Sequence, residues 1–253
     1  MSTVIYPSPI FGPVHSRRLG ISLGINLLPA DGKVCSFDCI YCECGFNADH
    51  RPHQKMPSRE AVRAALEAKL KEMHNEGVHP DVLTFAGNGE PTMHPDFLNI
   101  IHDTRELRDQ HCPEARISVL SNATQIMRPT VHEALLLVDN NIVKLDTVDK
   151  DFIEAVDRPT GHYDVSQIIE GMKAFNGQCI VQTMFLTGSV DNTSEAYVAP
   201  WLKALADIKP RSVMIYTIDR ETPDKSLRKA SPEVLDAIGE RVRALGIECS
   251  VAY

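Results

Sequence analysis

The chain has 253 residues, of which 43% are apolar and 24% are charged, enough to bury one large core or two smaller ones. It has no run of about 18 apolar residues, which excludes a membrane-spanning helix, and its N-terminus lacks the basic-then-apolar order of a signal peptide. We therefore expect a cytoplasmic protein, and the net charge of −8 argues against broad nucleic-acid binding.

Short β-rich runs alternate with helical runs along the whole chain, with no repeat of fixed period and no obvious linker. Continuous apolar runs of this kind are typical of parallel strands that are buried on both faces. The alternation predicts an α/β fold of about six strand–helix units in a single domain, residues 1–253. The predicted strands are residues 21–28, 82–86, 117–120, 142–145, 179–186, 213–218 and 247–252.

The helical runs carry recognisable start signals. Ser58, Asp164 and Ser231 are predicted N-cap residues, because each precedes an apolar pattern of helical period. The apolar stripe of the last helix extends to Leu245 in this prediction. Further helices are predicted to open at Pro95, at about Pro129 and near residue 194.

Polar residues follow nearly every predicted strand. In a barrel the carboxyl ends of all strands surround one mouth, whereas an open doubly wound sheet shares only the crevice at its switch point. The pattern therefore favours a complete or partial barrel, although ordinary polar loops would account for any single segment. These segments are residues 87–92, 121–124, 146–147, 187–189 and 219–222.

Four of the seven cysteines lie in the stretch CSFDCIYCECG, residues 35–45. Thiols stay reduced in the cytoplasm, so such a cluster indicates a metal site or catalysis more than disulfides. Cys35, Cys39 and Cys42 have the spacing C-x3-C-x2-C. The remaining cysteines are scattered and are predicted to be buried free thiols: Cys112, Cys179 and Cys249.

Two kinds of site remain open from the cysteine spacing. Zinc or an electron-transfer cluster normally takes four protein ligands, which would require Cys44 as the fourth. Three thiolates on a 4Fe–4S cluster instead leave one iron free to bind another molecule, as catalysis requires. Thiolates are suitable ligands in either case.

The cysteine motif resembles that of radical S-adenosylmethionine (SAM) enzymes, including an aromatic residue, Tyr41, before the last cysteine. The segment GNGEPT, residues 87–92, resembles the Gly-Gly-Glu-Pro motif of that superfamily and departs from it at Asn88. The opening FGPVHSRRLGISLGINLLP followed by CSFDCIYCECG resembles the iron–sulfur oxidoreductases related to the wybutosine-tRNA tricycle-forming enzyme. The resemblance implies a partial (β/α)6 TIM-like barrel.

The resemblance also implies the cofactors and the chemistry. A 4Fe–4S cluster on Cys35, Cys39 and Cys42, with Cys44 left out, would reductively cleave SAM to a 5′-deoxyadenosyl radical. That radical would abstract hydrogen from an unidentified substrate, and a low-potential donor such as flavodoxin or ferredoxin would supply the electron. The alternatives are tRNA modification, modification of a protein or peptide including glycyl-radical activation, and a non-enzymatic iron–sulfur or zinc-binding protein.

The SAM site expected from the resemblance lies at the strand ends. Asn122 could equally be a turn residue. Lys144 and Asp146 could either reach the ribose of SAM or pair as a structural ion pair. Arg220, like Arg17 and Arg18, is a candidate for binding a carboxylate or phosphate or for a solvated surface position. The predicted SAM-binding residues are Tyr41, Gly87, Gly89, Glu90, Pro91, Ser121, Asn122, Asp146 and Gln182.

The substrate is the least constrained part of the prediction. About six units would leave the barrel mouth open and without a lid, which suits a large substrate such as tRNA. However, 34 acidic residues outnumber 26 basic ones, and the densest basic segments are Arg17–Arg18 and residues 225–229. Since phosphate binding needs several cations together, we expect a small molecule or a protein segment rather than tRNA.

Overall fold

The structure, a computed structural model, describes residues 3–16 and 20–253, so Arg17 and Arg18 lie outside the described residues. Its centre is one eight-stranded sheet in the order β1-β2-β3-β4-β5-β6-β8-β10. All neighbouring strands are parallel except the antiparallel pair β1 and β2. The strands are β1 (Ile10–Ser16), β2 (Gly20–Ile25), β3 (Val82–Phe85), β4 (Arg116–Ser121), β5 (Asn140–Lys144), β6 (Cys179–Met184), β8 (Ser212–Tyr216) and β10 (Glu248–Ala252).

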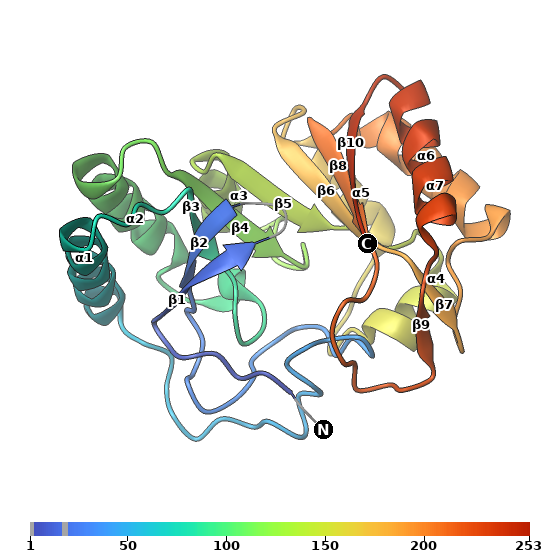
Figure 1. The fold of residues 1–253 in the computed structure, drawn as a ribbon. Helices are drawn as coiled ribbons and strands as arrows, with labels where there is room; N and C mark the ends of the chain where they lie inside the picture. The colour runs from blue at the N-terminus through green and yellow to red at the C-terminus, as the bar shows by residue number, and fades with distance from the viewer. Residues whose placement is uncertain (1–2, 17–19) are drawn as a thin grey trace.

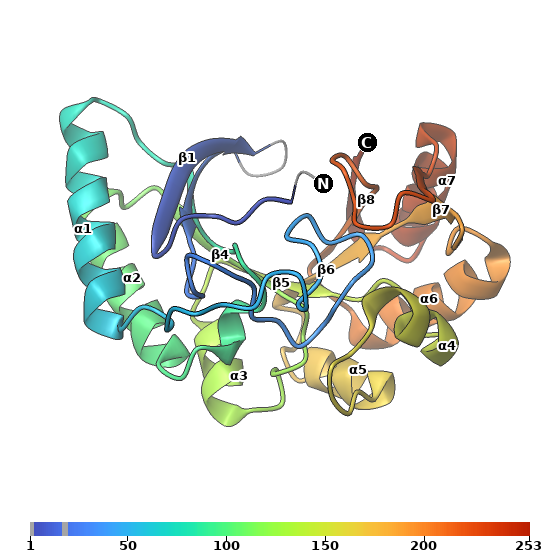
Figure 2. The same ribbon diagram turned by 90° about the horizontal axis from the view of Figure 1, so that it is seen from below.

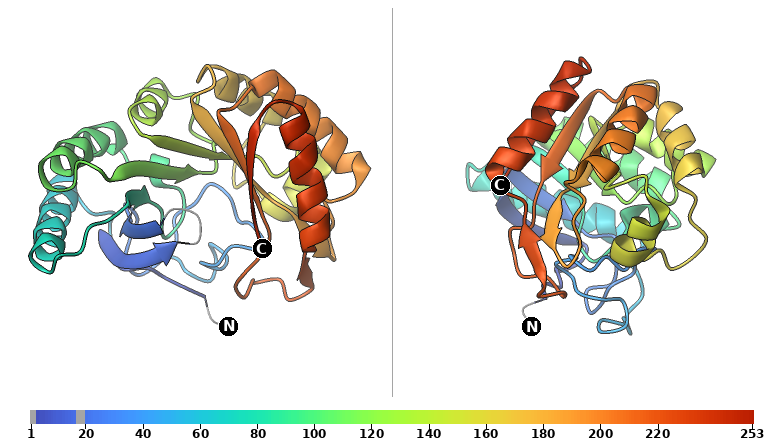
Figure 3. Two further views of the ribbon diagram at one scale, coloured as in Figure 1. Left: turned by 45° about the horizontal axis from the view of Figure 1, so that its top comes forward. Right: turned by 90° about the vertical axis from the view of Figure 1, so that its right-hand side faces the viewer.

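The sheet curves into an open arc with helices along its outer side (Figure 1; Figure 3). Within the described ranges β1 and β10 are its two edges and do not pair, so the arc is a partial barrel, as predicted. The helices are α1 (Arg59–Asn75), α2 (Phe97–His111), α3 (Pro129–Leu136), α5 (Val165–Lys173), α6 (Glu195–Ile208) and α7 (Pro232–Ala244).

The helix caps follow the sequence closely. The side chains of Ser58, Asp164 and Ser231 each accept a hydrogen bond from a backbone N–H in the first turn of α1, α5 and α7. Two details of the prediction are wrong. α2 begins at Phe97 after Asp96 as cap, not at Pro95, and Leu245 lies past the end of α7 with 43% of its surface exposed.

The main core lies between the sheet and the outer helices. On β5 and β6, Val143 and Val181 are paired in register and point into this core. The next residue on each strand, Lys144 and Gln182, points to the other face, and these two are also paired in register. A smaller apolar cluster occupies the inner side and includes Ile40 of the cysteine-containing loop. The alternation thus places polar side chains inside the arc.

Several elements were absent from the prediction. They include β1 and a two-stranded antiparallel sheet of β7 (Leu186–Gly188) and β9 (Leu227–Lys229). The segment after β5 forms a short helix, α4 (Lys150–Phe152), that continues as a π-helical turn, η2 (Ile153–Asp157). The segment after β3 forms a 3-10 turn, η1 (Pro91–Met93). None of the described helices is long and apolar enough to cross a membrane.

Candidate functional site

The loop between β2 and α1 carries the clustered cysteines and lies inside the arc of strands (Figure 2). Its backbone pairs with the segment that follows β3. Val34 N donates to Asn88 O at 2.9 Å, and Glu90 N donates to Val34 O at 3.1 Å. This pairing holds the first cysteine, Cys35, next to the GNGEPT segment, residues 87–92.

The two glycines of the motif permit this close approach. Gly89 has a φ of +127°, and a Cβ there would lie 1.9 Å from the carbonyl oxygen of Val34. Gly87 has a φ of +130°, and a Cβ there would lie 2.7 Å from the side chain of Asn26. At both positions the atoms that leave no room for a side chain belong to the segment after β2, which includes Asn26 and Val34. Close packing of this segment is therefore a structural reason for glycine at positions 87 and 89, in addition to the predicted contact with SAM.

Asn88, where the motif departs from Gly-Gly-Glu-Pro, is fully buried. Its side chain accepts from Tyr6 N at 2.8 Å, donates to Tyr6 O at 2.9 Å and donates to Pro29 O at 2.8 Å. The amide thus satisfies both backbone groups of one residue in the N-terminal segment. Asn88 therefore ties that segment to the motif, a role that was not predicted from the sequence.

Glu90 is buried and joins the ends of β3 and β4. Its Oε1 accepts from Thr92 N at 3.1 Å and from Ser121 Oγ at 2.9 Å, and its Oε2 accepts from Asn122 N at 2.6 Å. Burial raises the pKa of Glu90, and the hydrogen bonds from Thr92, Asn122 and Ser121 oppose that shift. Three predicted site residues, Glu90, Ser121 and Asn122, are therefore in direct contact, and Pro91 begins the 3-10 turn beside them.

Asn122 reaches from the end of β4 to the cysteine loop. Its Nδ2 donates to Ser36 Oγ at 3.0 Å and lies 3.5 Å from Cys35 Sγ. Its Oδ1 accepts from Thr124 Oγ1 at 2.8 Å, which holds the amide in this orientation. The side chain is therefore a contact to the first cysteine as well as a turn residue.

The three cysteines of the C-x3-C-x2-C motif differ in their surroundings. Burial raises the pKa of Cys35 to about 12 and raises that of Cys39 as well. Hydrogen bonding from Cys44 and the nearby Lys33 cation lower the pKa of Cys42 to about 6. Sharing its proton with Cys42, together with burial, raises the pKa of Cys44. The Cys44 thiol also points toward Gly87 O at 3.4 Å.

A second group of charges lies on the other side of the cysteine loop. Lys144 at the end of β5 forms ion pairs with Asp146 and, at 2.8 Å, with Asp157 of η2. Tyr41 hydrogen-bonds to both Lys144 and Asp146, and Cys39 Sγ lies 3.6 Å from Asp157 Oδ1. Lys144 and Asp146 are therefore partners in an ion pair, one of the two alternatives that the sequence left open.

Asp157 was missed because nothing near it in the sequence resembles a site motif. Its backbone carbonyl accepts from Asp38 N at 3.0 Å, which brings η2 against the cysteine loop. Burial raises the pKa of Asp157 to about 6 despite the opposing effect of Lys144. Its position depends on a π-helical turn that apolar periodicity does not reveal.

Gln182 and Arg220 are two further residues that the sequence analysis singled out. Gln182 is buried on β6 beside Lys144, on the inner face of the sheet. Arg220 pairs with Glu43 at 2.6 Å and donates to Tyr6 Oη at 3.0 Å. Its guanidinium therefore links the loop after β8 to the cysteine loop and the N-terminal segment.

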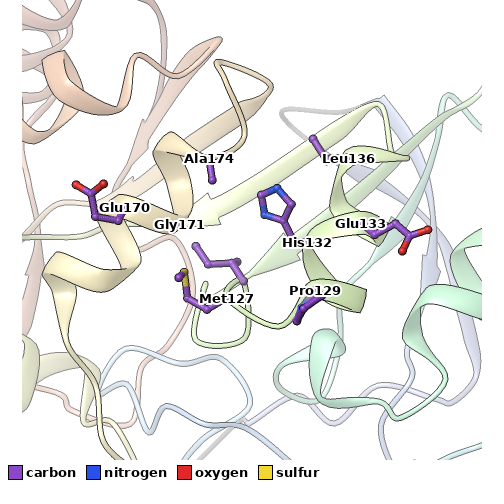
Figure 4. A pocket seen from close by; sticks show the side chains of 9 residues that line it. Met127, Pro129, His132, Glu133, Leu136, Glu170, Gly171 and Ala174 are labelled. Carbon is purple, nitrogen blue, oxygen red and sulfur yellow. The ribbon is translucent and has the colours of Figure 1, made fainter.

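A separate groove of about 420 Å³ lies in the outer helical layer, between α3 and α5 (Figure 4). Glu133 and Glu170 are on opposite sides of it, and Met127 and Leu136 give it an apolar lining. None of the predicted site residues lines this groove. Throughout residues 3–16 and 20–253, no group of three or more His, Cys, Asp or Glu side chains is arranged to hold a single metal ion.

Comparisons with known proteins bear on this arrangement. Residues 31–199 match the sequence model of the Radical SAM superfamily. The chain is 33% identical over 233 residues to a UPF0026 protein of Methanocaldococcus jannaschii, covering 90% of this chain and 69% of that protein.

Two solved structures are similar in fold. One is a radical SAM methyltransferase from Sphaerobacter thermophilus, with a TM-score of 0.66 and 15% identity over 91% of this chain. The other is Streptococcus suis SuiB bound to S-adenosylmethionine, with a TM-score of 0.65 and 15% identity over 89% of this chain. The chain spans 65% and 50% of those two solved chains.

Proposed function

The chain belongs to the radical SAM superfamily, whose enzymes use a 4Fe–4S cluster and SAM, and we propose that Cys35, Cys39 and Cys42 hold the cluster. This membership makes the protein an enzyme and sets aside the non-enzymatic alternative. When bound at these cysteines, the cluster would supply the reductive cleavage of SAM that leads to hydrogen abstraction from the substrate.

The donor set fits a cluster of this kind. Three thiols lie on one short loop, enclosed by the strand ends, with the Lys33 and Lys144 cations on either side of them. Thiolates are the usual ligands of iron–sulfur clusters, and each thiolate binds its own iron atom, so their sulfurs need not converge as they do on one ion. Cys44 is occupied with Gly87 O and Cys42, which supports its exclusion from the ligand set.

The observation that carries the proposal is the Glu90 junction. One buried carboxylate joins the motif after β3 to the residues after β4, and Asn122 continues the connection to Cys35. Among the described residues Oε2 of Glu90 accepts one hydrogen bond, from Asn122 N, whereas Oε1 accepts three. Oε2 therefore has a free lone pair for the amino group of SAM, a charge-assisted bond of the strong kind.

The remaining residues complete the proposed SAM site. Asn122 positions the Cys35 thiolate, and the phenol of Tyr41 is fixed by Lys144 and Asp146 at the end of β5. Gln182 offers a buried amide on the inner face for SAM or substrate. The strand ends partly bury Cys35, Cys39 and Cys42, and bound SAM would further limit the access of water to the reacting atoms.

Anaerobic reconstitution of the full chain tests this proposal. We expect about four iron and four sulfide per chain, which is the composition of one 4Fe–4S cluster. With dithionite and SAM, mass spectrometry should then detect 5′-deoxyadenosine. One bound zinc ion without iron or 5′-deoxyadenosine would contradict the proposal.

For the substrate we favour a small molecule or a protein segment. The basic run at 225–229 is partly neutralised, since Lys225 pairs with Glu221 at 3.1 Å and Lys229 with Asp219 at 3.5 Å. A low-potential donor such as flavodoxin or ferredoxin is the proposed electron source. The test is whether 5′-deoxyadenosine formation rises with the small-molecule, protein or tRNA fraction of a cell extract.

Modification of tRNA is the second candidate. It rests on the resemblance of residues 11–29 and 35–45 to the group related to the wybutosine-tRNA tricycle-forming enzyme. Glycyl-radical activation is a special case of the protein-segment proposal. Stimulation by the tRNA fraction alone would favour the second candidate over the first.

A further inference from the structure

Lys33 is a buried cation that the proposed chemistry does not use. Only 1% of its side-chain surface is exposed, and its Nζ donates to Gly45 O at 2.7 Å. Taking an ammonium group out of water costs several kcal/mol unless opposite charges compensate it. The nearest carboxylate, Asp38, is 3.5 Å away and 25% exposed, so it compensates the ammonium only in part.

The second observation is the position of Lys33 within the cysteine loop. The residue stands two positions before Cys35, and its backbone N–H donates to His50 O at 2.7 Å. Its side chain spans the cysteine loop to Gly45, one residue beyond Cys44. The buried Lys33 ammonium therefore lies inside the loop segment 33–45, which carries Cys35, Cys39 and Cys42.

Lys144, the second buried lysine beside the loop, differs from Lys33 in the number of carboxylates that pair with it. Lys144 pairs with two carboxylates, Asp146 and Asp157, which together offset its charge. Lys33 has one carboxylate, and that one is partly hydrated. Carboxylates therefore offset less of the positive charge of Lys33 than of Lys144, and more of it acts on the thiolates.

We propose that Lys33 is a positioning residue whose ammonium group closes the cysteine loop and sets the reduction potential of the cluster that the loop binds. The inference rests on the proposed function, because it requires the cluster. One-electron reduction by a low-potential donor adds one negative charge to a buried site. A fixed cation beside the thiolates stabilises the reduced form and so raises the potential, since net charge and hydrogen bonding around the sulfurs tune such clusters.

The test measures the midpoint potential of the reconstituted full chain by electron paramagnetic resonance at stepped potentials. We expect Lys33→Met to be harder to reduce, with a reduction equilibrium constant at least about tenfold lower, or about 59 mV for one electron. Lys33→Arg keeps the charge and should stay close to the wild-type protein. Lys71→Met, which removes a lysine on α1 with 58% side-chain exposure, is the matched control and should not change the potential.

Asp38→Asn provides a test of opposite sign. It removes the negative charge but keeps an oxygen that can accept from Asn47 N, which Asp38 Oδ1 does at 2.7 Å. We expect its potential to rise. If Lys33→Met fails to bind iron, Asp38→Asn decides, and an unchanged or lower potential in that variant overturns the inference.

The outcomes separate this inference from the proposed function. A wild-type protein that binds no iron–sulfur cluster refutes the proposed function and the inference with it. A wild-type cluster whose potential is the same in Lys33→Met and Asp38→Asn refutes the inference and leaves the proposed function intact.

Discussion

At the scale of single residues, the Glu90 carboxylate has a structural role and a proposed binding role, and a mutation that removes the carboxylate affects both. The carboxylate accepts hydrogen bonds from Thr92, Ser121 and Asn122, and it is also the proposed partner of the SAM amine. These hydrogen bonds are buried or partly buried, and leaving such donors unpaired costs about 1–3 kcal/mol.

We therefore predict two effects of Glu90→Ala. The free energy of unfolding should fall by about 2 kcal/mol, measured on the apo protein by denaturant titration. SAM should bind the reconstituted protein at least about tenfold more weakly by calorimetry, a loss of about 1.4 kcal/mol. Glu240→Ala, at a side chain that is 74% exposed, is the control and should change neither quantity. Unchanged SAM affinity would remove Glu90 from the site.

Cys44 provides a sharper test of the ligand set. Its thiol is buried against Gly87 O, so we expect Cys44→Ala to keep the cluster and to lose only a small packing contribution. Cys39→Ala should lose it, because Cys39 is one of the three proposed ligands. The measurement is iron and sulfide content after anaerobic reconstitution. Equal iron loss in both variants would contradict a three-cysteine site.

At the scale of elements, the pairing of two loops depends on one glycine. In Gly89→Ala the new Cβ would overlap the carbonyl of Val34 in a backbone conformation that alanine rarely adopts. We expect the variant to melt at a lower temperature and to bind less iron after reconstitution. Gly77→Ala also has a positive φ but has no atom within 4 Å of its Cβ, so it should reduce stability by about 1 kcal/mol and leave iron binding unchanged.

Much of the fold and part of the candidate site could be predicted from the sequence. The parallel strands, the outer helices and the N-caps at Ser58, Asp164 and Ser231 follow from local patterns and are confirmed. The contact among Glu90, Ser121 and Asn122 follows from motifs at neighbouring strand ends. Once the strands were predicted to be parallel, these segments had to meet at one edge of the sheet.

The rest depends on contacts between residues far apart in the chain. A lysine in a loop is normally exposed, so nothing local indicates that Lys33 is buried. Asp157 reaches Cys39 only because a π-helical turn packs on the cysteine loop, and such turns have no apolar period. The two-stranded sheet of β7 and β9 was missed because its strands have three residues each, too few for an alternation to be recognised.

At the scale of the whole molecule, charge limits the substrates that bind strongly. The net charge is −8, and Lys225 and Lys229 of the basic run already pair with acidic neighbours. We predict that bulk tRNA binds the reconstituted protein more weakly than about 1 μM at physiological salt, measured by fluorescence titration at two salt concentrations. Sub-micromolar binding that is lost when residues 225–229 are changed to glutamate would restore the tRNA candidate.

The order in which the chain is made has a consequence for the cysteine loop. Cys39 contacts Asp157, 118 positions later, and Tyr6 contacts Arg220, 214 positions later. Because the N-terminal part leaves the ribosome first, the four clustered thiols emerge long before the residues that cover them. During that interval all four are fully accessible to oxidants, whereas in the folded loop Cys44 is buried and Cys35, Cys39 and Cys42 are partly buried. We therefore expect oxygen to damage this protein most while it is being synthesised, and iron to be inserted only after η2 has emerged.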